Sequence, residues 1–214
     1  MKHLILSLSF AGLLLVGCGD QKADKAVDRI LAQKNPGFVR VVNLTAGPVE
    51  YWYKNRHVSP TIPSMDTSDL LPIGTGDQTV RIEIGTKKIE VKVKLSTGIG
   101  ETIILMPDQT TKFIDNEQRY ATADSNVRIV PVDAGGKLPG TVAFTGADTK
   151  SMPVKDSLIT LNQGMINAPD GSPLEIKERI AYNLFIVATP KKVYYILSKN
   201  ASDKKPVSQG QSAA

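Results

Sequence analysis

The sequence predicts an all-β protein of two tandem small antiparallel β-sandwich (Ig-like) domains, placed after an N-terminal export signal and a short helical tether. Val, Ile, Thr, Gly and Pro are frequent and aromatic residues make up only 6%, a composition typical of short strands joined by turns. Apolar and polar residues alternate in many short runs, as in strands with one buried face. Two such runs begin alike 88 residues apart, which indicates a repeated unit.

The N-terminus predicts a lipoprotein signal peptide over residues 1–17. A basic start at Lys2 precedes an apolar run, Leu4–Val16, that is too short to span a bilayer. The run ends in Leu15-Val16-Gly17-Cys18, which resembles the lipobox of bacterial lipoproteins. The resemblance implies cleavage before Cys18, acylation with chains such as palmitate, and the membrane as a partner. The alternative is a free cysteine after an ordinary signal peptide.

Lipidation at Cys18 would hold the chain in the bacterial cell envelope, facing the periplasm. The common signal for retention in the inner membrane is an aspartate directly after the cysteine, and Gly19 stands there, which favours the outer membrane. Because the chain has a single cysteine, its use as an anchor excludes disulfides, zinc–cysteine sites and thiol nucleophiles.

The segments that flank the predicted domains are polar. Residues 18–36 predict a tether with one short amphipathic helix, because Val27, Ile30 and Leu31 follow a helical period that Pro36 ends. Residues 201–214 are rich in Ser, Lys, Gln and Ala and offer little to bury, which predicts a disordered tail.

The repeat divides the remaining chain into two predicted domains, residues 37–115 and 126–200. The first begins Phe-Val-Arg-Val-Val-Asn at 38–43 and the second Asn-Val-Arg-Ile-Val-Pro at 126–131, and each start alternates as a half-buried strand does. Further strand-like runs follow each start, and a polar break at 116–125 separates the two sets. We therefore favour two domains over the alternative of one long sandwich.

The first domain is predicted to contain strands near 38–44, 49–54, 68–72, 78–84, 88–95 and 101–106. Its clearest element is a hairpin whose register follows from charge. A two-residue Gly85-Thr86 turn pairs Arg81 with Glu90 and Glu83 with Lys88, whereas a turn shifted by one residue places like charges opposite each other. Glycine in the first turn position also suits a type II′ turn.

The second domain is predicted to contain strands near 126–133, 140–145, 157–162, 174–178, 182–188 and 193–198. Two of them, at 184–188 and 193–197, are nearly unbroken apolar runs. Such runs predict a central hairpin that is covered on both faces.

Candidate catalytic residues are few, and the sequence predicts no catalytic site, no metal and no cofactor. The nucleophile-elbow, zinc-protease, Walker and calcium-loop motifs are all missing. The mature chain has one histidine, His57, and nearby Ser59, Ser64, Ser68 and the aspartates at 66 and 69 make a Ser-His-Asp triad an open alternative. The competing interpretation is a proline-interrupted loop in which these side chains cap turns.

The segment Tyr51-Trp52-Tyr53 is the densest group of aromatic residues. In a strand Tyr51 and Tyr53 share one face and Trp52 takes the other, so a large ring facing solvent could bind a sugar or anchor a protein interface. The alternative is that the rings pack the core or the junction between domains.

The net charge is +5 and includes Lys2. No block of five or six like charges occurs, which argues against nucleic acid as a partner. For an exported lipoprotein the acidic partners to consider are lipid head groups, an anionic polysaccharide or another protein. An ordinary solvated surface is the alternative.

The order of these segments resembles that of a known family. The likeness is carried by the Phe-Val-Arg-Val-Val-Asn strand at 38–43, the segment 67–72, the hairpin at 78–95 and the start of the second domain at 126–130, which contains Val-Arg-Ile. Through these segments the chain resembles the periplasmic accessory proteins of alginate O-acetylation (AlgF-like) and their relatives in cellulose acetylation. The likeness extends loosely to about residue 198. The first domain also resembles a broader family of envelope β-sandwich proteins that begin with the same strand.

The resemblance implies a non-catalytic role. Members of the acetylation group support the transfer of acetyl groups to the polymer and contact the acetyltransferase components. The chain is therefore expected to be a lipid-anchored periplasmic adaptor that supports O-acetylation of an exopolysaccharide such as alginate, with acetyltransferase complex proteins as partners. The lipobox is a departure from the family pattern. The alternative function is an envelope lipoprotein that binds sugar or an adhesion partner through Tyr51 and Trp52.

Overall fold

The computed structural model describes residues 36–116, 125–146, 150–161, 164–177 and 180–200, and these residues form strands and no helix. The predicted all-β class is confirmed. The signal peptide at 1–17, Cys18, most of the tether at 18–36, the centre of the polar break and the tail at 201–214 lie outside the described residues. No described segment is a helix long and apolar enough to cross a membrane.

The strands of the first half, residues 37–116, are β1 (Gly37–Asn43), β2 (Glu50–Tyr53), β3 (Arg56–His57), β4 (Asp66–Thr67), β5 (Leu71–Ile73), β6 (Gly76–Ile84), β7 (Lys87–Leu95), β8 (Gly100–Leu105) and β9 (Thr111–Asn116). Those of the second half, residues 125–200, are β10 (Ser125–Asp133), β11 (Thr141–Gly146), β12 (Lys150–Pro153), β13 (Ser157–Leu161), β14 (Gly164–Asn167), β15 (Pro173–Ile176), β16 (Tyr182–Ala188) and β17 (Val193–Lys199).

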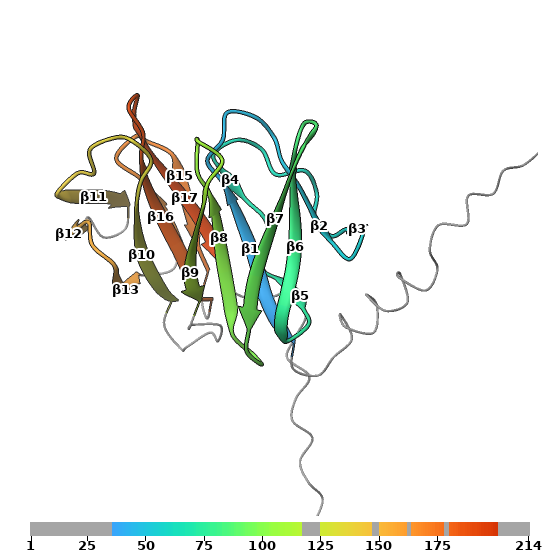
Figure 1. Ribbon diagram of the computed structural model, residues 1–214. Helices are drawn as coiled ribbons and strands as arrows, with labels where there is room; N and C mark the ends of the chain where they lie inside the picture. Colours follow the sequence, from blue (N-terminus) through green and yellow to red (C-terminus); the bar gives the residue numbers. More distant parts are fainter. Residues whose placement is uncertain (1–35, 117–124, 147–149, 162–163, 178–179, 201–214) are drawn as a thin grey trace, which may run out of the picture.

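Each half contains two sheets with corresponding strand orders. The first inner sheet has the order β4-β1-β8-β9, with β5 also paired to β1, and the second inner sheet has the order β13-β10-β16-β17. The first outer sheet is β3-β2-β6-β7 and the second outer sheet is β12-β11-β14-β15. The inner sheets lie next to each other in the middle of the molecule and the outer sheets lie on either side (Figure 1).

The inner sheets are mixed, which corrects the prediction of purely antiparallel domains. β1 runs parallel to β8, and β10 runs parallel to β16. Parallel neighbours need a long crossover connection. In each half this connection passes twice through the outer sheet, with edge strands of the inner sheet (β4 and β5, or β13) between the two passages. Alternation along a strand does not reveal the direction of its neighbour, so the sequence pattern could not show these parallel pairs.

The predicted register of the β6–β7 hairpin is confirmed. Arg81 faces Glu90 and Glu83 faces Lys88, so the turn consists of Gly85 and Thr86. Gly85 has a φ of 58° and Thr86 is not among the residues with positive φ. This combination fits a type II′ turn and excludes type I′, which needs positive φ at both central residues.

The β16–β17 hairpin pairs as predicted, but only one of its strands is covered on both faces. Every residue of β16 is buried, whereas β17 is an edge strand whose residues are mostly half-buried. Five strands were not predicted at all: β3, β4, β9, β12 and β14. They are short, apolar alternation in them is weak, and all of them except β14 lie at the edge of their sheet.

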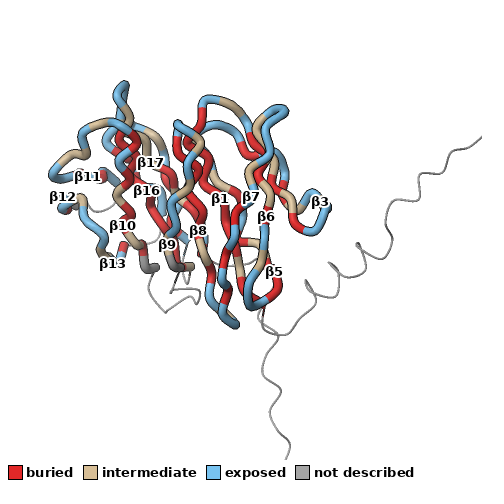
Figure 2. The backbone as a smooth tube through the Cα atoms, viewed as in Figure 1, coloured by how far each residue is buried: buried red, intermediate tan, exposed pale blue. Residues whose placement is uncertain are grey.

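Three buried apolar clusters alternate with the sheets. The first cluster lies between the first outer and inner sheets and includes Tyr51, Tyr53, Val80 and Ile103. A second cluster joins the second inner sheet to the second outer sheet. The third cluster joins the two inner sheets to each other. Buried backbone therefore runs along β1, β8, β10 and β16 through the middle of the molecule (Figure 2).

The contact between the two inner sheets uses matching positions from both halves. The repeat aligns Arg40 with Arg128, and the parallel registers then align Thr102 with Asn183. Four residues of each half in the third cluster correspond under this alignment: Val42, Leu44, Ile104 and Met106 with Val130, Val132, Phe185 and Val187. The interface is thus isologous, as in a twofold dimer, although it forms within one chain.

This interface corrects the prediction that β1 has one solvated face. Val39 and Val41 point into the first cluster, and Val42 points into the third. Arg40, on the same face as Val42, is fully buried. Both faces of β1 are covered because the second half packs against the first.

Candidate functional site: an aromatic row on the first outer sheet

Four side chains form a row across the outward face of the first outer sheet. Trp52 on β2 lies opposite His57 on β3 and opposite Arg81 on β6, and Arg81 lies opposite Glu90 on β7. Directly opposite residues in antiparallel strands point to the same side. The outward direction follows because Val80 and Ile82, on either side of Arg81, are buried in the first cluster. We call these four residues the Trp52 row.

The Trp52 ring lies between two cross-strand neighbours. The guanidinium carbon of Arg81 is 5.1 Å from the centroid of the Trp52 ring, within the range of a cation–π contact. The His57 ring is also 5.1 Å away, centroid to centroid, at a tilt of 41°. The indole N–H of Trp52 donates to Oε2 of Glu50 at 3.2 Å. Trp52 remains half-buried, and His57 is exposed.

Arg81 is held in place from two sides. Its Nε forms an ion pair with Oε1 of Glu83 at 2.9 Å, and its Nη1 donates to Oδ1 of Asn55 at 3.2 Å. Asn55 belongs to the two-residue turn between β2 and β3, in which Lys54 and Asn55 both have positive φ, 47° and 64°, as a type I′ turn requires. The turn therefore sets the positions of His57 and of the amide that orients Arg81.

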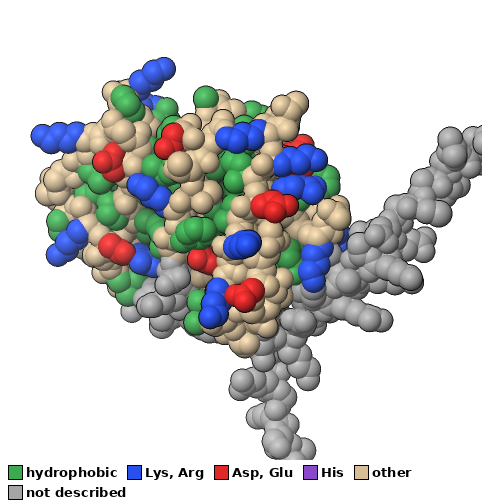
Figure 3. All heavy atoms as spheres, viewed as in Figure 1, with side chains coloured by type: hydrophobic (Ala, Val, Ile, Leu, Met, Phe, Trp, Pro, Cys, Tyr) green, Lys and Arg blue, Asp and Glu red, His purple; other side chains and the backbone are tan. Residues whose placement is uncertain are grey.

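Charged side chains of both signs surround the row. Lys88, Glu90, Lys92 and Lys94 are exposed along β7, and Lys88 contacts Glu83 at 3.6 Å. Figure 3 shows acidic and basic side chains interspersed over β6 and β7. Lysines on an edge strand also discourage pairing with another chain, so part of this pattern has a structural explanation.

The predicted aromatic group divides between the two faces of β2. Tyr51 and Tyr53 are buried in the first cluster, with 0% and 1% exposure. Burial raises the pKa of both phenols, and the Tyr53 hydroxyl donates to Oε1 of Gln78 at 2.6 Å. A ligand on the outer face would therefore contact Trp52 and neither tyrosine. Core packing, which the sequence analysis gave as the alternative to a binding role, therefore holds for the two tyrosines.

The second half lacks an aromatic residue at the matching position. In β11, Val142 and Phe144 are buried in the second cluster as Tyr51 and Tyr53 are in the first, and Ala143 between them is exposed. Ala143 faces Ser151, and the next outward residue, Thr145, faces Asn167 of β14, so neither outward position carries an aromatic ring. Because the inner interface is shared by the two halves and the Trp52 row is not, the row is not needed to build this kind of sheet.

The three serines considered for a triad donate to backbone carbonyls. The hydroxyl of Ser59 donates to the carbonyl of Pro60 at 2.7 Å, that of Ser64 to the carbonyl of Thr45, and that of Ser68 to the carbonyl of Asp69 at 2.9 Å. The structure places His57 against Trp52 and brings none of these hydroxyls to it by a described hydrogen bond. Among the described residues no group of three His, Cys, Asp or Glu is placed to hold a metal.

A buried polar network links the two halves at the inner interface. Arg40 donates from Nη1 to Oδ1 of Asn200 at 3.0 Å and from Nη2 to the carbonyl of Lys199. Asn200 in turn donates to Oδ1 of Asn183 at 2.9 Å. Burial lowers the pKa of Arg40 to about 9, while the charge of Asp69 opposes this shift. Arg40 therefore stays charged at neutral pH, and its hydrogen-bond acceptors come from the far end of the second half.

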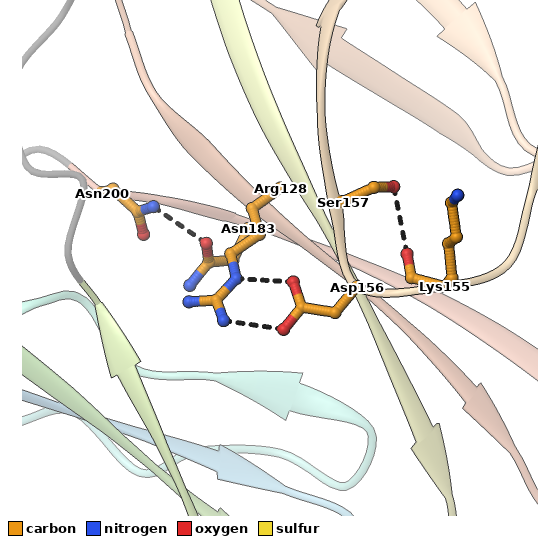
Figure 4. A network of polar contacts seen from close by, with 6 residues as sticks. All are labelled: Arg128, Lys155, Asp156, Ser157, Asn183 and Asn200. Atoms are coloured by element: carbon orange, nitrogen blue, oxygen red, sulfur yellow. Dashed lines mark hydrogen bonds and ion pairs between the residues drawn. The ribbon is translucent and has the colours of Figure 1, made fainter.

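The matching arginine of the second half has a carboxylate partner. Arg128 binds both oxygens of Asp156, from Nε at 2.9 Å and from Nη2 at 2.8 Å (Figure 4). The side chain of Asp156 is 56% exposed, and the hydrogen bond from Arg128 lowers its pKa. Sequence alternation gave no sign of either network, because the partners lie 28 and 160 residues from their arginines.

These features define an all-β protein whose described residues include a partly exposed row of aromatic and charged side chains on an outer sheet. No family model matches the chain, and no curated protein matches it.

Proposed function

We propose that this chain is a non-catalytic, lipid-anchored adaptor of the bacterial envelope that supports O-acetylation of an exopolysaccharide such as alginate. Acylated Cys18 would hold the chain at the membrane, facing the periplasm, with the outer membrane favoured. Acetyltransferase complex proteins would be its partners. The finer description of the fold as two Ig-like sandwich domains, 37–115 and 126–200, belongs to the same proposal and is consistent with the corresponding strand orders of the two halves.

The observation that carries the proposal is a difference between two similar halves: they share the inner interface, but only the first outer sheet bears the Trp52 row. The inner sheets bury matching residues against each other, so this surface is occupied within the chain. The outer sheets remain available, and the first of them bears the Trp52 row, whereas the outward residues of β11 in the second, Ala143 and Thr145, are not aromatic. Aromatic and arginine side chains are the residues that most often anchor binding. A membrane anchor would also raise the local concentration of partners, so modest affinity would be enough.

Deletion of the gene tests the adaptor role. We expect the deletion strain to make the polymer in normal amount and to lose its O-acetyl groups, and we expect the wild-type chain to restore them. A Cys18→Ala chain, which keeps the folded part and loses the anchor, should restore acetylation only weakly. Normal acetylation in the deletion strain would refute the proposal.

Partner capture gives an independent test. The lipidated chain, purified from detergent-solubilised envelope, should bring down acetyltransferase subunits, and an unrelated envelope lipoprotein of similar abundance serves as the control. Failure to recover these subunits would count against an adaptor that works by contact.

A second candidate function is favoured by the partial exposure of Trp52. An envelope lipoprotein could bind sugar or an adhesion partner through this ring without any role in acetylation. In that case the deletion strain would keep its acetyl groups, and the Trp52→Ala variant would lose binding while remaining folded.

A further inference from the structure

The Trp52 row has the composition of a sugar-binding surface. Sugar rings present C–H faces that pack on aromatic rings, and their hydroxyls bond to planar polar groups at the ring margins. Around Trp52 these groups are Glu50, Arg81 and Asn55. The row crosses four strands and thus three inter-strand spacings, which amounts to about 14 Å. It is long enough to contact several consecutive units of a polymer.

The two faces of the Trp52 ring differ in how firmly they are covered. Arg81 on one face is fixed by Glu83 and Asn55. His57 approaches the ring from the opposite side, because β3 and β6 lie on opposite sides of β2. β3 is a two-residue strand at the sheet edge, and His57 is exposed. The tilt of 41° between the rings is far from parallel stacking. Rotation of the His57 side chain would uncover this face of Trp52 without disturbing the sheet.

We propose that the Trp52 row binds an anionic polysaccharide, a polyuronate, with a sugar ring taking the place of His57 on the face of Trp52. This inference rests on the proposed function and names the ligand of its candidate site. The net charge of +5 attracts a polyanion, and exposed Lys92 and Lys94 lie on the same face of β7 as Glu90 of the row. Arg81, held behind the ring, would keep the indole in position.

The position of His57 predicts the direction in which its removal should change the affinity for the sugar. If the sugar displaces His57, the His57–Trp52 contact must break on binding, so the His57→Ala variant should bind about two- to tenfold tighter. If His57 were instead a direct contact to the ligand, the same variant would bind more weakly. Trp52→Ala should bind about tenfold more weakly or not at all.

Trp52 is the single tryptophan of the chain, so its fluorescence reports on this site alone. We would titrate the full chain in detergent with alginate oligosaccharides and follow the fluorescence alongside calorimetry. Met165→Ala is the matched control, because Met165 is 54% exposed on the second outer sheet and its loss should leave affinity unchanged. Far-UV circular dichroism of each variant checks that it is folded. Trp52→Leu, which keeps an apolar side chain without the aromatic ring, is a second variant and is measured by calorimetry.

The outcomes separate this inference from the adaptor role. A change in Trp52 fluorescence with oligouronate and none with a neutral gluco-oligosaccharide supports it, as does tighter binding by His57→Ala. Equal response to both sugars overturns the choice of an anionic ligand. Heat of binding without a fluorescence change, weaker binding by His57→Ala, or no binding at all overturns the proposed site. None of these results affects the acetylation test, which depends on the polymer made by the deletion strain.

Discussion

The Asn200→Ala substitution probes how the two halves are held together. Asn200 is 2% exposed and follows β17 at the end of the second half. Its carboxamide accepts a hydrogen bond from Arg40 of the first half and donates one to Asn183. Alanine removes both bonds and leaves the charged guanidinium of Arg40 with the Lys199 carbonyl as its remaining described acceptor. The alanine variant therefore removes the bond between the side chains of Arg40 on β1 and Asn200 after β17.

The expected cost follows from the two bonds. A hydrogen bond to a charged group contributes about 1.5–3 kcal/mol, and one between neutral amides about 0.5–1.5 kcal/mol. The free energy of unfolding should therefore fall by about 2–4 kcal/mol. For a chain of this size each kcal/mol lowers the melting temperature by about 2–4 °C, so a decrease of about 10 °C is expected.

Urea unfolding followed by two probes measures this effect. Trp52 fluorescence reports on the first half, and far-UV circular dichroism reports on both. The transitions should shift together, because Asn200 contacts the first half although it belongs to the second. Asn167→Ala, at an exposed position of β14, is the control and should change stability by no more than about 0.5 kcal/mol. A shift for Asn200→Ala no larger than this control would refute the argument.

Two further predictions concern local features. Gly85→Ala should lower the free energy of unfolding by about 1 kcal/mol, because Gly85 has a φ of 58°. Gly47→Ala is the control and should not destabilise the chain, because neither a positive φ nor a nearby atom opposes a methyl group there. Equal urea midpoints for the two variants would contradict the turn assignment. Asp156→Asn should cost less than about 1 kcal/mol at pH 7, because the Arg128–Asp156 pair is partly exposed. Arg128 lowers the pKa of Asp156 below its usual value of 3.8. The stability lost in Asp156→Asn should therefore be present above pH 3.8 and should vanish as the pH falls through the lowered pKa. A loss of stability that grows in acid would contradict this pH dependence.

Local patterns in the sequence were enough to predict most of the strands and the register of one hairpin. The β6–β7 hairpin could be predicted because its selecting charges, Arg81, Glu83, Lys88 and Glu90, are close in the chain and face each other. The division of Tyr51 and Trp52 between opposite faces followed from strand alternation alone. The β2–β3 hairpin was missed, although Asn55 in its two-residue turn is a residue that tolerates positive φ and could have indicated it.

The candidate site could be foreseen only in part. Trp52 and His57 drew attention by residue type, but Arg81 was noted only for its place in a hairpin. Its contact with the Trp52 ring and its bond to Asn55 depend on the pairing of β2 with β6. These strands are separated by more than twenty residues, and nothing in either segment specifies its partner.

The sequence by itself determined the local features of this protein: the strands with clear alternation, the turn at Gly85 and the side of β2 on which Trp52 lies. These depend on backbone sterics and on side chains a few residues apart. Only the tertiary structure decided that β1 and β10 lie beside parallel partners and that the two halves pack through matching residues. Arg40 shows the physical reason. Its place in an alternating strand predicts a solvated side chain, and only the packing of the second half turns it into a buried cation bonded to Asn200.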